Sequence, residues 1–80
     1  MRLPRDLSAA ELVKALEKFG YSPTRQTGSH LRLTTSVPVP HHITVPAHDP
    51  LRVGTLASII GAVAQAQKLS RDEVLHRLFD

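Results

Sequence analysis

Hydrophobic residues recur at helical spacing in three segments of this chain. The first segment follows Ser8, which forms an S-x-x-E capping box with Glu11. A second apolar stripe begins around residues 52–55, and a third follows the capping box of Ser70 and Glu73. The pattern predicts three helices with these apolar positions: Leu12, Leu16 and Phe19; Leu56, Ile59, Ile60 and Val63; Val74, Leu75 and Leu78.

Between the first and second helices, apolar and polar residues alternate with period two, which is typical of strands. The clearest strand is 30–35, in which Leu31 and Leu33 alternate with polar neighbours. Residues 42–45 repeat the alternation, and 21–25 form a weaker candidate, because its proline belongs on a sheet edge. The intervening turns and loops are expected at residues 27–29, 36–41 and 46–50.

The predicted fold is α+β, with element order α-β-β-β-α and a short C-terminal helix. We expect one domain, residues 1–80, with three antiparallel strands that pack one apolar face under the helices and leave the other face open. A chain of this length buries roughly 60–65% of its unfolded surface. The strand phases place these residues on the open face: His30, Arg32, Thr34, His42 and Thr44.

Charge and composition narrow the class of partner. Residues 1–35 carry six lysines and arginines against three acids, whereas residues 36–80 carry four of each, so the net charge of +3 belongs to the half with the 30–35 strand. This distribution suits a polyanionic partner. The chain has no cysteine, which fits a reducing cytoplasm, and no apolar run near the roughly 20 residues of a membrane span. We therefore expect a cytoplasmic protein without a membrane partner.

Two stretches carry a resemblance to a known family: "LVKALEKFGYSPTRQTGSHLRL" and "ITVPAHDPLRVGTLASIIGAVAQAQKLSRDEVL". Over residues 8–78 the chain resembles the HicA family of toxins. These are small messenger-RNA interferases of bacterial type II toxin–antitoxin systems, with a fold like that of double-stranded-RNA-binding domains. The resemblance implies that the catalytic histidine of the "GSH" turn is His30, that a HicB-like antitoxin is the partner, and that no cofactor is needed. The proline-containing loop 36–41 departs from the family's usual polar turn, which concerns substrate approach more than chemistry.

The chemistry of a histidine in this position agrees with that assignment. A ribonuclease that uses no metal activates the ribose 2′-hydroxyl, and an imidazole suits this proton transfer at neutral pH. Backbone N–H groups of Gly28 and Ser29 could bind a phosphate oxygen, and Ser29 itself is a turn-former rather than a nucleophile. Arg32, about 7 Å along the same strand face, and Arg25 are candidate phosphate contacts. The alternative is an ordinary strand-face histidine beside solubilising arginines.

The spacing of the remaining histidines in the sequence does not match that of a metal site. His41 and His42 are adjacent on a strand and point to opposite faces, and no zinc-binding spacing is present. We therefore expect no metal. His42 is a possible second proton-transfer group because its phase matches that of His30, and His48 is a candidate RNA contact. His76 is expected on a helix surface.

The functional hypothesis is a metal-independent endoribonuclease that acts on messenger RNA. With one tyrosine and two phenylalanines, the chain has no platform for stacking several unpaired bases, so recognition would rest on phosphates and shape. One alternative is a non-catalytic RNA-binding module of the same fold, in which His30 is a contact residue. A third hypothesis is a structural adaptor that docks through the second helix.

Overall fold

The fold has the predicted elements in the predicted order. The computed structural model describes residues 3–80, and the α+β class with order α-β-β-β-α and a C-terminal helix is confirmed. In chain order the elements are α1 (Ala9–Leu16), a 3-10 turn (Glu17–Phe19), β1 (Ser22–Thr27), β2 (His30–Thr35), β3 (His41–Pro46), α2 (Val53–Gln67) and α3 (Arg71–Phe79).

Both predicted capping boxes are formed, so α1 and α3 begin where their sequences indicate. The Glu11 backbone N–H donates to Ser8 Oγ at 3.0 Å, and the Ser8 N–H donates to the Glu11 carboxylate at 2.9 Å. The bond from the Ser8 N–H and, after it, the interaction of the carboxylate with the Ser8 side chain hold the pKa of Glu11 below its usual range, because both favour the charged carboxylate. Ser70 and Glu73 form the same pair of bonds at the start of α3.

A glycine marks the end of the first helical segment in the sequence, but no such residue marks the end of α2. Gly20 ends the 3-10 turn at φ +81°, and a Cβ there would lie 2.9 Å from Thr35 Oγ1, which donates to the Phe19 carbonyl. A glycine is therefore needed at this position. α2 ends instead at Lys68, at φ +58° in the left-handed region. No glycine marks that end in the sequence, and the end of α2 was not predicted.

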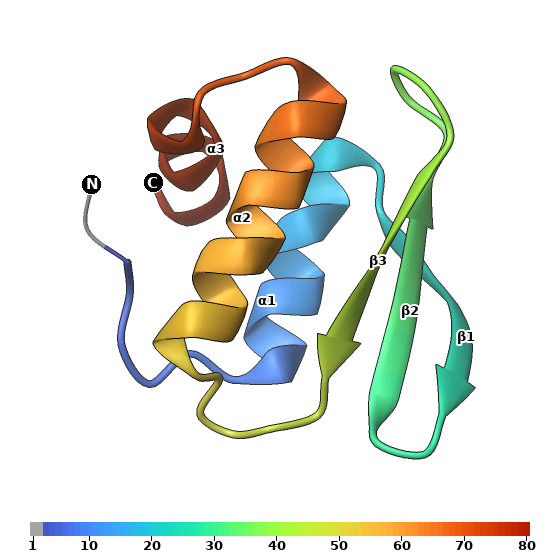
Figure 1. Ribbon diagram of the computed structural model, residues 1–80, viewed down its shortest axis with the longest axis vertical. Helices are drawn as coiled ribbons and strands as arrows, with labels where there is room; N and C mark the ends of the chain where they lie inside the picture. The colour runs from blue at the N-terminus through green and yellow to red at the C-terminus, as the bar shows by residue number, and fades with distance from the viewer. Residues whose placement is uncertain (1–2) are drawn as a thin grey trace.

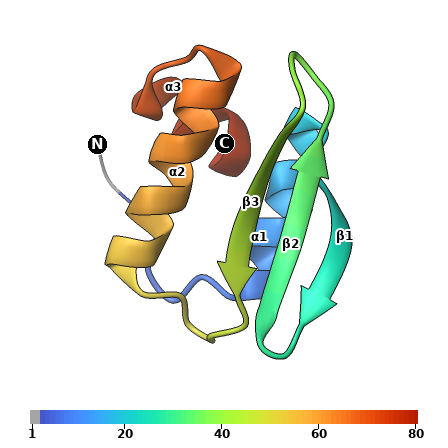
Figure 2. The same cartoon turned by 45° about the vertical axis from the view of Figure 1, so that its right-hand side comes forward.

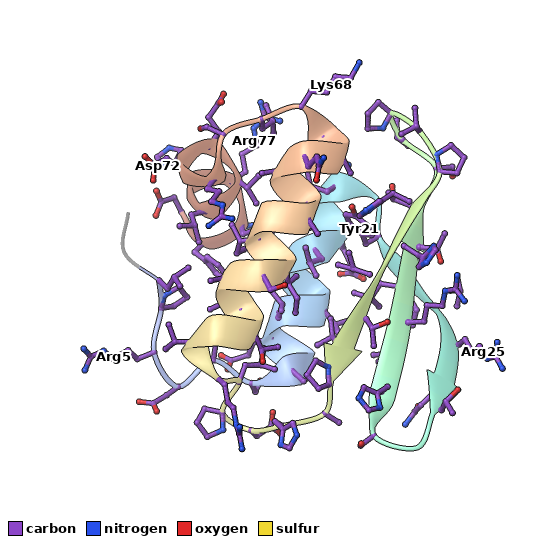
Figure 3. The ribbon with its side chains drawn as sticks, viewed as in Figure 1. Arg5, Tyr21, Arg25, Lys68, Asp72 and Arg77 are labelled. Atoms are coloured by element: carbon purple, nitrogen blue, oxygen red, sulfur yellow. The ribbon has the colours of Figure 1, made fainter. Side chains whose placement is uncertain are left out.

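The sheet and the helices form two layers (Figures 1 and 2). The strands pair antiparallel in the order β1-β2-β3. Leu33, Ile43 and Val45 point to the helices and are buried, and Tyr21 lies between the layers (Figure 3), with its hydroxyl 2.8 Å from His41 Nδ1. β1 is different, because all six of its residues are exposed. The helix layer therefore covers β2 and β3 but leaves β1 open on both faces.

A second consequence of the topology is that several connections meet at one end of the molecule. The β1–β2 turn, the β3–α2 loop and the N-terminal ends of α1 and α2 all lie at the lower end in Figures 1 and 2.

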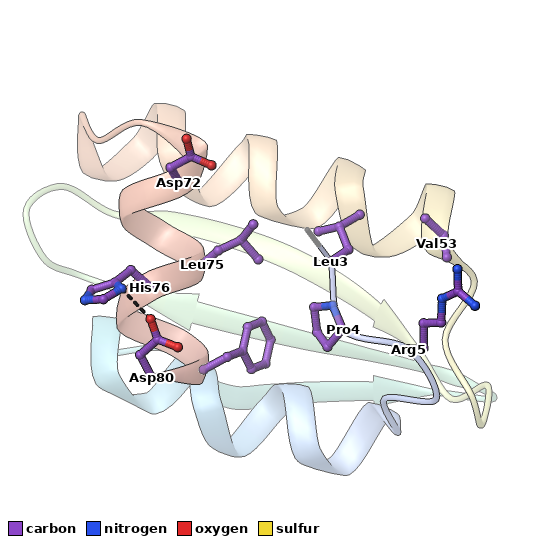
Figure 4. A pocket seen from close by; sticks show the side chains of 9 residues that line it. Leu3, Pro4, Arg5, Val53, Asp72, Leu75, His76 and Asp80 are labelled. Atoms are coloured by element: carbon purple, nitrogen blue, oxygen red, sulfur yellow. Dashed lines mark ion pairs between the residues drawn. The ribbon is translucent and has the colours of Figure 1, made fainter. Parts of the chain in front are cut away.

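On another side, residues 3–5, Val53 and α3 enclose a pocket with a partly apolar lining (Figure 4). No helix within residues 3–80 has both the length and the apolar character needed to cross a bilayer.

Candidate functional site

His30 is the first residue of β2, directly after a two-residue turn. Thr27 pairs with His30 across that turn, and only its first residue, Gly28, has positive φ (+57°). A type II′ hairpin turn has this pattern and requires glycine there. A Cβ on Gly28 would meet nothing within 4 Å, so backbone conformation rather than packing explains this glycine. The tight turn fixes the His30 backbone and leaves its side chain exposed.

Two hydrogen bonds attach the turn to the rest of the molecule, one between backbone groups and one to a side chain. The Ala47 N–H donates to the Ser29 carbonyl at 2.6 Å, which holds the end of β3 against the turn. Two residues on, Asp49 Oδ1 accepts the Ala9 N–H at 2.8 Å and satisfies one of the free donors at the start of α1. The turn that carries His30 is thereby linked to the β3–α2 loop, and this loop to α1.

The open face of the sheet carries two arginines directly opposite each other. Arg25 pairs with Arg32, and Arg25 extends from β1 away from the helices (Figure 3). Cβ atoms of such cross-strand neighbours are about 5 Å apart, and like charges placed there repel. Among residues 3–80, neither arginine forms an ion pair with a carboxylate. The pair is therefore a site of unneutralised positive charge that an anion would stabilise.

A β-bulge in β1 lies next to this arginine pair. The register shifts between Pro23 and Arg25, so that β1 contains one more residue than the matching part of β2. Counting back from the Thr27–His30 pair at the turn already places Arg25 opposite Arg32, so the extra residue changes the pairing of Ser22 and Pro23 and not that of Arg25. Thr24, the extra residue, hydrogen-bonds Thr34 through the two hydroxyls at 2.8 Å.

The other three histidines considered from the sequence, His42, His48 and His76, lie in different parts of the structure. His42 lies opposite Thr34, four residues along β2 from His30, which corresponds to about 14 Å along the strand at about 3.4 Å per residue. His48 is exposed, one residue beyond the Ala47 that bonds the turn. His76 is an exposed residue of α3 that forms an ion pair with Asp80 (Figure 4). In the described chain, no three histidine, aspartate or glutamate side chains gather as metal ligands would.

A pocket lies beside His30, between α1 and the β1–β2 hairpin, and we call it the α1–β2 pocket. Its volume is about 640 Å³. It is lined by Ala9, Ala10, Val13, Lys14, Glu17, Gln26, Ser29, His30, Leu31, Val45, Ala47 and Asp49. The sequence pattern did not lead us to expect α1 residues near His30, although Ala10, Lys14 and Glu17 lie on one face of the helix by their spacing. Gln26 and Asp49 had no such signal, since only strand register and loop packing bring them to the pocket.

The fold and the site together define a class of protein. The arrangement α-β-β-β-α is that of double-stranded-RNA-binding domains, here with a histidine and two unpaired arginines on the open face of the sheet. A family model described as the HicA toxin of bacterial toxin–antitoxin systems matches residues 9–67.

The chain belongs to the HicA toxin family. The matched range runs from the first residue of α1 to the last of α2, whereas α3 lies beyond it. No curated protein and no solved structure matches the chain.

The hydrogen bond between Asp49 and the start of α1 leads to a prediction about stability. Asp49→Ala should lower the free energy of unfolding by about 1 kcal/mol, the usual value of a lost helix-cap acceptor. Asp49→Asn keeps an acceptor oxygen and should retain most of the stability. Urea unfolding followed by circular dichroism measures both variants. Equal midpoints for Asp49→Ala and the unchanged protein would show that this bond does not stabilise α1.

Proposed function

We propose that this toxin is an endoribonuclease that cleaves messenger RNA with His30 and is held inactive by a HicB-like antitoxin. The observation that carries the proposal is the position of His30. Its side chain is exposed at the first residue of a strand, on the same open face as the paired arginines Arg25 and Arg32. A proton-transfer group and a phosphate-binding charge thus lie on one accessible surface.

The chemistry that this arrangement supports is an internal transesterification. The His30 imidazole takes the proton of a ribose 2′-hydroxyl, and the 2′-oxygen forms a bond to the adjacent phosphorus. The bond from phosphorus to the 5′-oxygen of the next nucleotide breaks, and that oxygen takes a proton from water. The His30 imidazolium gives its proton to the hydroxide that remains, which restores the neutral imidazole. The products are a 2′,3′-cyclic phosphate and a free 5′-hydroxyl, and no oxidant or metal-bound hydroxide takes part.

Neighbouring groups hold the RNA in position. Arg32 is two residues from His30 on the same strand face, about 7 Å along β2, and contacts a flanking phosphate together with Arg25. The N–H groups of the Gly28–Ser29 turn and the His48 side chain are further phosphate contacts at the same end of the sheet. Because recognition of phosphates reads no base, we expect cleavage with low sequence preference, in the cytoplasm where messenger RNA is translated.

The roles of His42 and the antitoxin follow from the same geometry. His42 lies about 14 Å along the strand direction from His30 and is not its neighbour in the sheet. A second proton-transfer role therefore requires the His42 ring to lean along the face toward the same phosphate. An antitoxin that covers the open sheet face would block His30 and both arginines at once. A standard-sized contact of roughly 800 Å² per partner is large enough for this.

The proposed reaction should not depend on a metal ion. Purified toxin, freed of antitoxin and incubated with RNA in excess EDTA, is expected to cleave at the rate seen without chelator, because an imidazole base needs no metal-bound hydroxide. The fragments should end in 2′,3′-cyclic phosphates, which mass spectrometry identifies. A magnesium-dependent nuclease in a parallel reaction verifies that chelation is complete.

Two results would contradict the proposal in different ways. Cleavage that is lost with EDTA and restored by Mg²⁺ or Zn²⁺ would assign the reaction to a metal centre. Tight RNA binding without any cleavage product, by a protein that still arrests growth, would make this chain a non-catalytic RNA-binding module of the same fold.

A further inference from the structure

The open face of the sheet carries its polar side chains in three rows that cross the strands. His30 is in the first row, at the turn. Arg25 and Arg32 form the second row, and Thr34 and His42 form the third. Along β2 the rows are two residues, or about 7 Å, apart. This spacing is close to the distance between successive phosphorus atoms of an RNA strand, so an RNA strand that runs along β2 meets a new row with each phosphate.

The chemistry of the third row suits a phosphate as well. Among the residues of the three strands there is no aspartate or glutamate, so no carboxylate of the sheet repels an anion. The His42 side chain is exposed, and the Thr34 hydroxyl lies 2.8 Å from that of Thr24. When Thr24 donates this hydrogen bond, the Thr34 hydroxyl proton is free to bond a phosphate oxygen. An imidazolium and a hydroxyl are both common donors to phosphates of the nucleic-acid backbone.

The distance between His42 and His30 decides which phosphate the third row meets. The two histidines are about 14 Å apart along the strand, twice the spacing of the rows. A group that transfers a proton must come within about 3 Å of the reacting oxygen. The oxygens that react during cleavage all belong to the phosphate beside His30. His42 therefore faces the phosphate two positions further along the RNA.

Beyond the third row the polar surface ends. Residues 36–40, which join β2 to β3, carry no charge, and Val37 and Val39 are exposed among them. The Gln67 side chain donates to the Val37 carbonyl at 2.9 Å, which attaches this loop to α2. A phosphate beyond the third row would thus lie next to apolar side chains. The open face accordingly binds three consecutive phosphates in this direction, counted from the one that is cleaved.

We propose that the third row, His42 with Thr34 and Thr24, binds the backbone phosphate two nucleotides from the cleaved bond. The inference rests on the proposed ribonuclease function and states which part of the substrate this end of the sheet holds. His42 is then a binding residue that positions the RNA along β2, and the efficient substrate is a strand with at least two phosphates beyond the cleaved one.

This contact should depend on pH, because an imidazole binds a phosphate more strongly when it is protonated. Two groups that carry or can carry charge surround His42. The ring of His41 is stacked against it with 6.4 Å between centroids, and Arg32 is its diagonal neighbour on β2. Thr34 and Thr24, on the strands beside it, are uncharged. Since other histidines titrate in the same range, the contribution of His42 is the difference between the unchanged protein and His42 variants at each pH.

The test uses DNA oligonucleotides that contain a single ribonucleotide, so that only one 2′-hydroxyl can react. In each oligonucleotide one phosphate near the cleavage site, on either side of it, is replaced by an uncharged methylphosphonate. Purified toxin, freed of antitoxin, cleaves each substrate at about pH 6. We expect the replacement two positions from the cleaved bond, on one side, to raise KM about tenfold, because a charge-assisted contact is lost. The replacement three positions away on that side should have no effect.

Variants of His42 show whether this residue makes the contact. His42→Ala should raise KM of the fully charged substrate about tenfold at about pH 6, and the methylphosphonate two positions away should then cost nothing further. His42→Arg keeps a permanent positive charge and should retain a low KM at about pH 8 as well. The loss should lie in KM, whereas loss of a proton-transfer group lowers kcat. His76→Ala removes an exposed histidine of α3 and is the matched control.

The outcomes separate this inference from the proposed function. If the methylphosphonate two positions away cost the same in His42→Ala as in the unchanged protein, the third row would not contact that phosphate, and the ribonuclease would stand. A lower kcat with unchanged KM in His42→Ala would make His42 a proton-transfer group and also overturn the inference. No cleavage of these substrates or of RNA would overturn the proposed function itself, and the affinities of all-DNA strands with the same replacements would then still test the third row.

Discussion

Replacing His30 by alanine is expected to reduce RNA cleavage by about 10²–10⁴-fold, the contribution of a positioned proton-transfer group. Expression of the variant should no longer arrest growth. RNA affinity should stay close to that of the unchanged protein, because the phosphate-binding arginines remain. The fold should be retained as well, since the His30 side chain is exposed and surface substitutions usually change stability by less than about 0.5 kcal/mol. Cleavage assays, RNA-binding titrations and thermal unfolding of one preparation measure these quantities together.

Two further measurements distinguish proton transfer from a binding role of His30. Free imidazole added to His30→Ala should restore part of the cleavage, because the exposed position leaves the small base access to the RNA. His76→Ala removes another exposed histidine, on α3, and should cleave normally. His42→Ala tests the second proton-transfer position on the same face. A folded His30→Ala variant that cleaves at the unchanged rate would falsify the catalytic assignment.

The second large effect is expected from replacing Arg25 and Arg32 together. Both arginines lie unpaired on the open face, so the double alanine variant should bind RNA more weakly and with a lower dependence on salt. Each phosphate contact on a single strand contributes about 0.7 to the slope of log affinity against log salt concentration, so the loss of two should lower the slope by about 1.4. Because the antitoxin is proposed to cover the same face, its association should also slow, and more at low salt than at high salt.

A matched variant controls for net charge in this experiment. Arg5→Ala combined with Arg77→Ala removes the same two charges from a part of the surface remote from Arg25 (Figure 3). It should leave the RNA affinity and the antitoxin association rate almost unchanged at moderate salt. If Arg25→Ala/Arg32→Ala lost RNA binding but kept the affinity and salt dependence of antitoxin binding, the antitoxin would have to act from another surface, such as α2 or α3.

Much of the fold could be predicted from the sequence because the relevant signals are local. The capping boxes at Ser8 and Ser70 involve residues three apart, and both are formed as predicted. The alternation around Leu33 correctly gave the buried face of β2, because side-chain direction in a strand depends only on position along it. β1 was predicted as an edge strand from Pro23, which is confirmed, although the strand extends to Thr27.

The candidate site was only partly visible in the sequence for the opposite reason. The approximate distance between His30 and Arg32 follows from the rise along one strand. The pairing of Arg25 with Arg32 follows from the two-residue turn Gly28–Ser29, but the sequence pattern had placed the turn at residues 27–29 and the end of the first strand at Arg25, so the pairing was not predicted. The separation of His30 from His42 depends on the register between β2 and β3, because a shared face alone does not make two residues neighbours.

The sequence by itself therefore determined the elements, their order and the face on which His30 lies, since helix caps, turns and strand alternation are set by residues within a few positions of one another. Only the tertiary structure decided how far His42 lies from His30 and that a pocket opens between α1 and the β1–β2 hairpin. Those features arise where segments distant in the chain meet. Examples are α1 beside the β1–β2 hairpin, and Asp49 bonded to the start of α1 from 40 residues away.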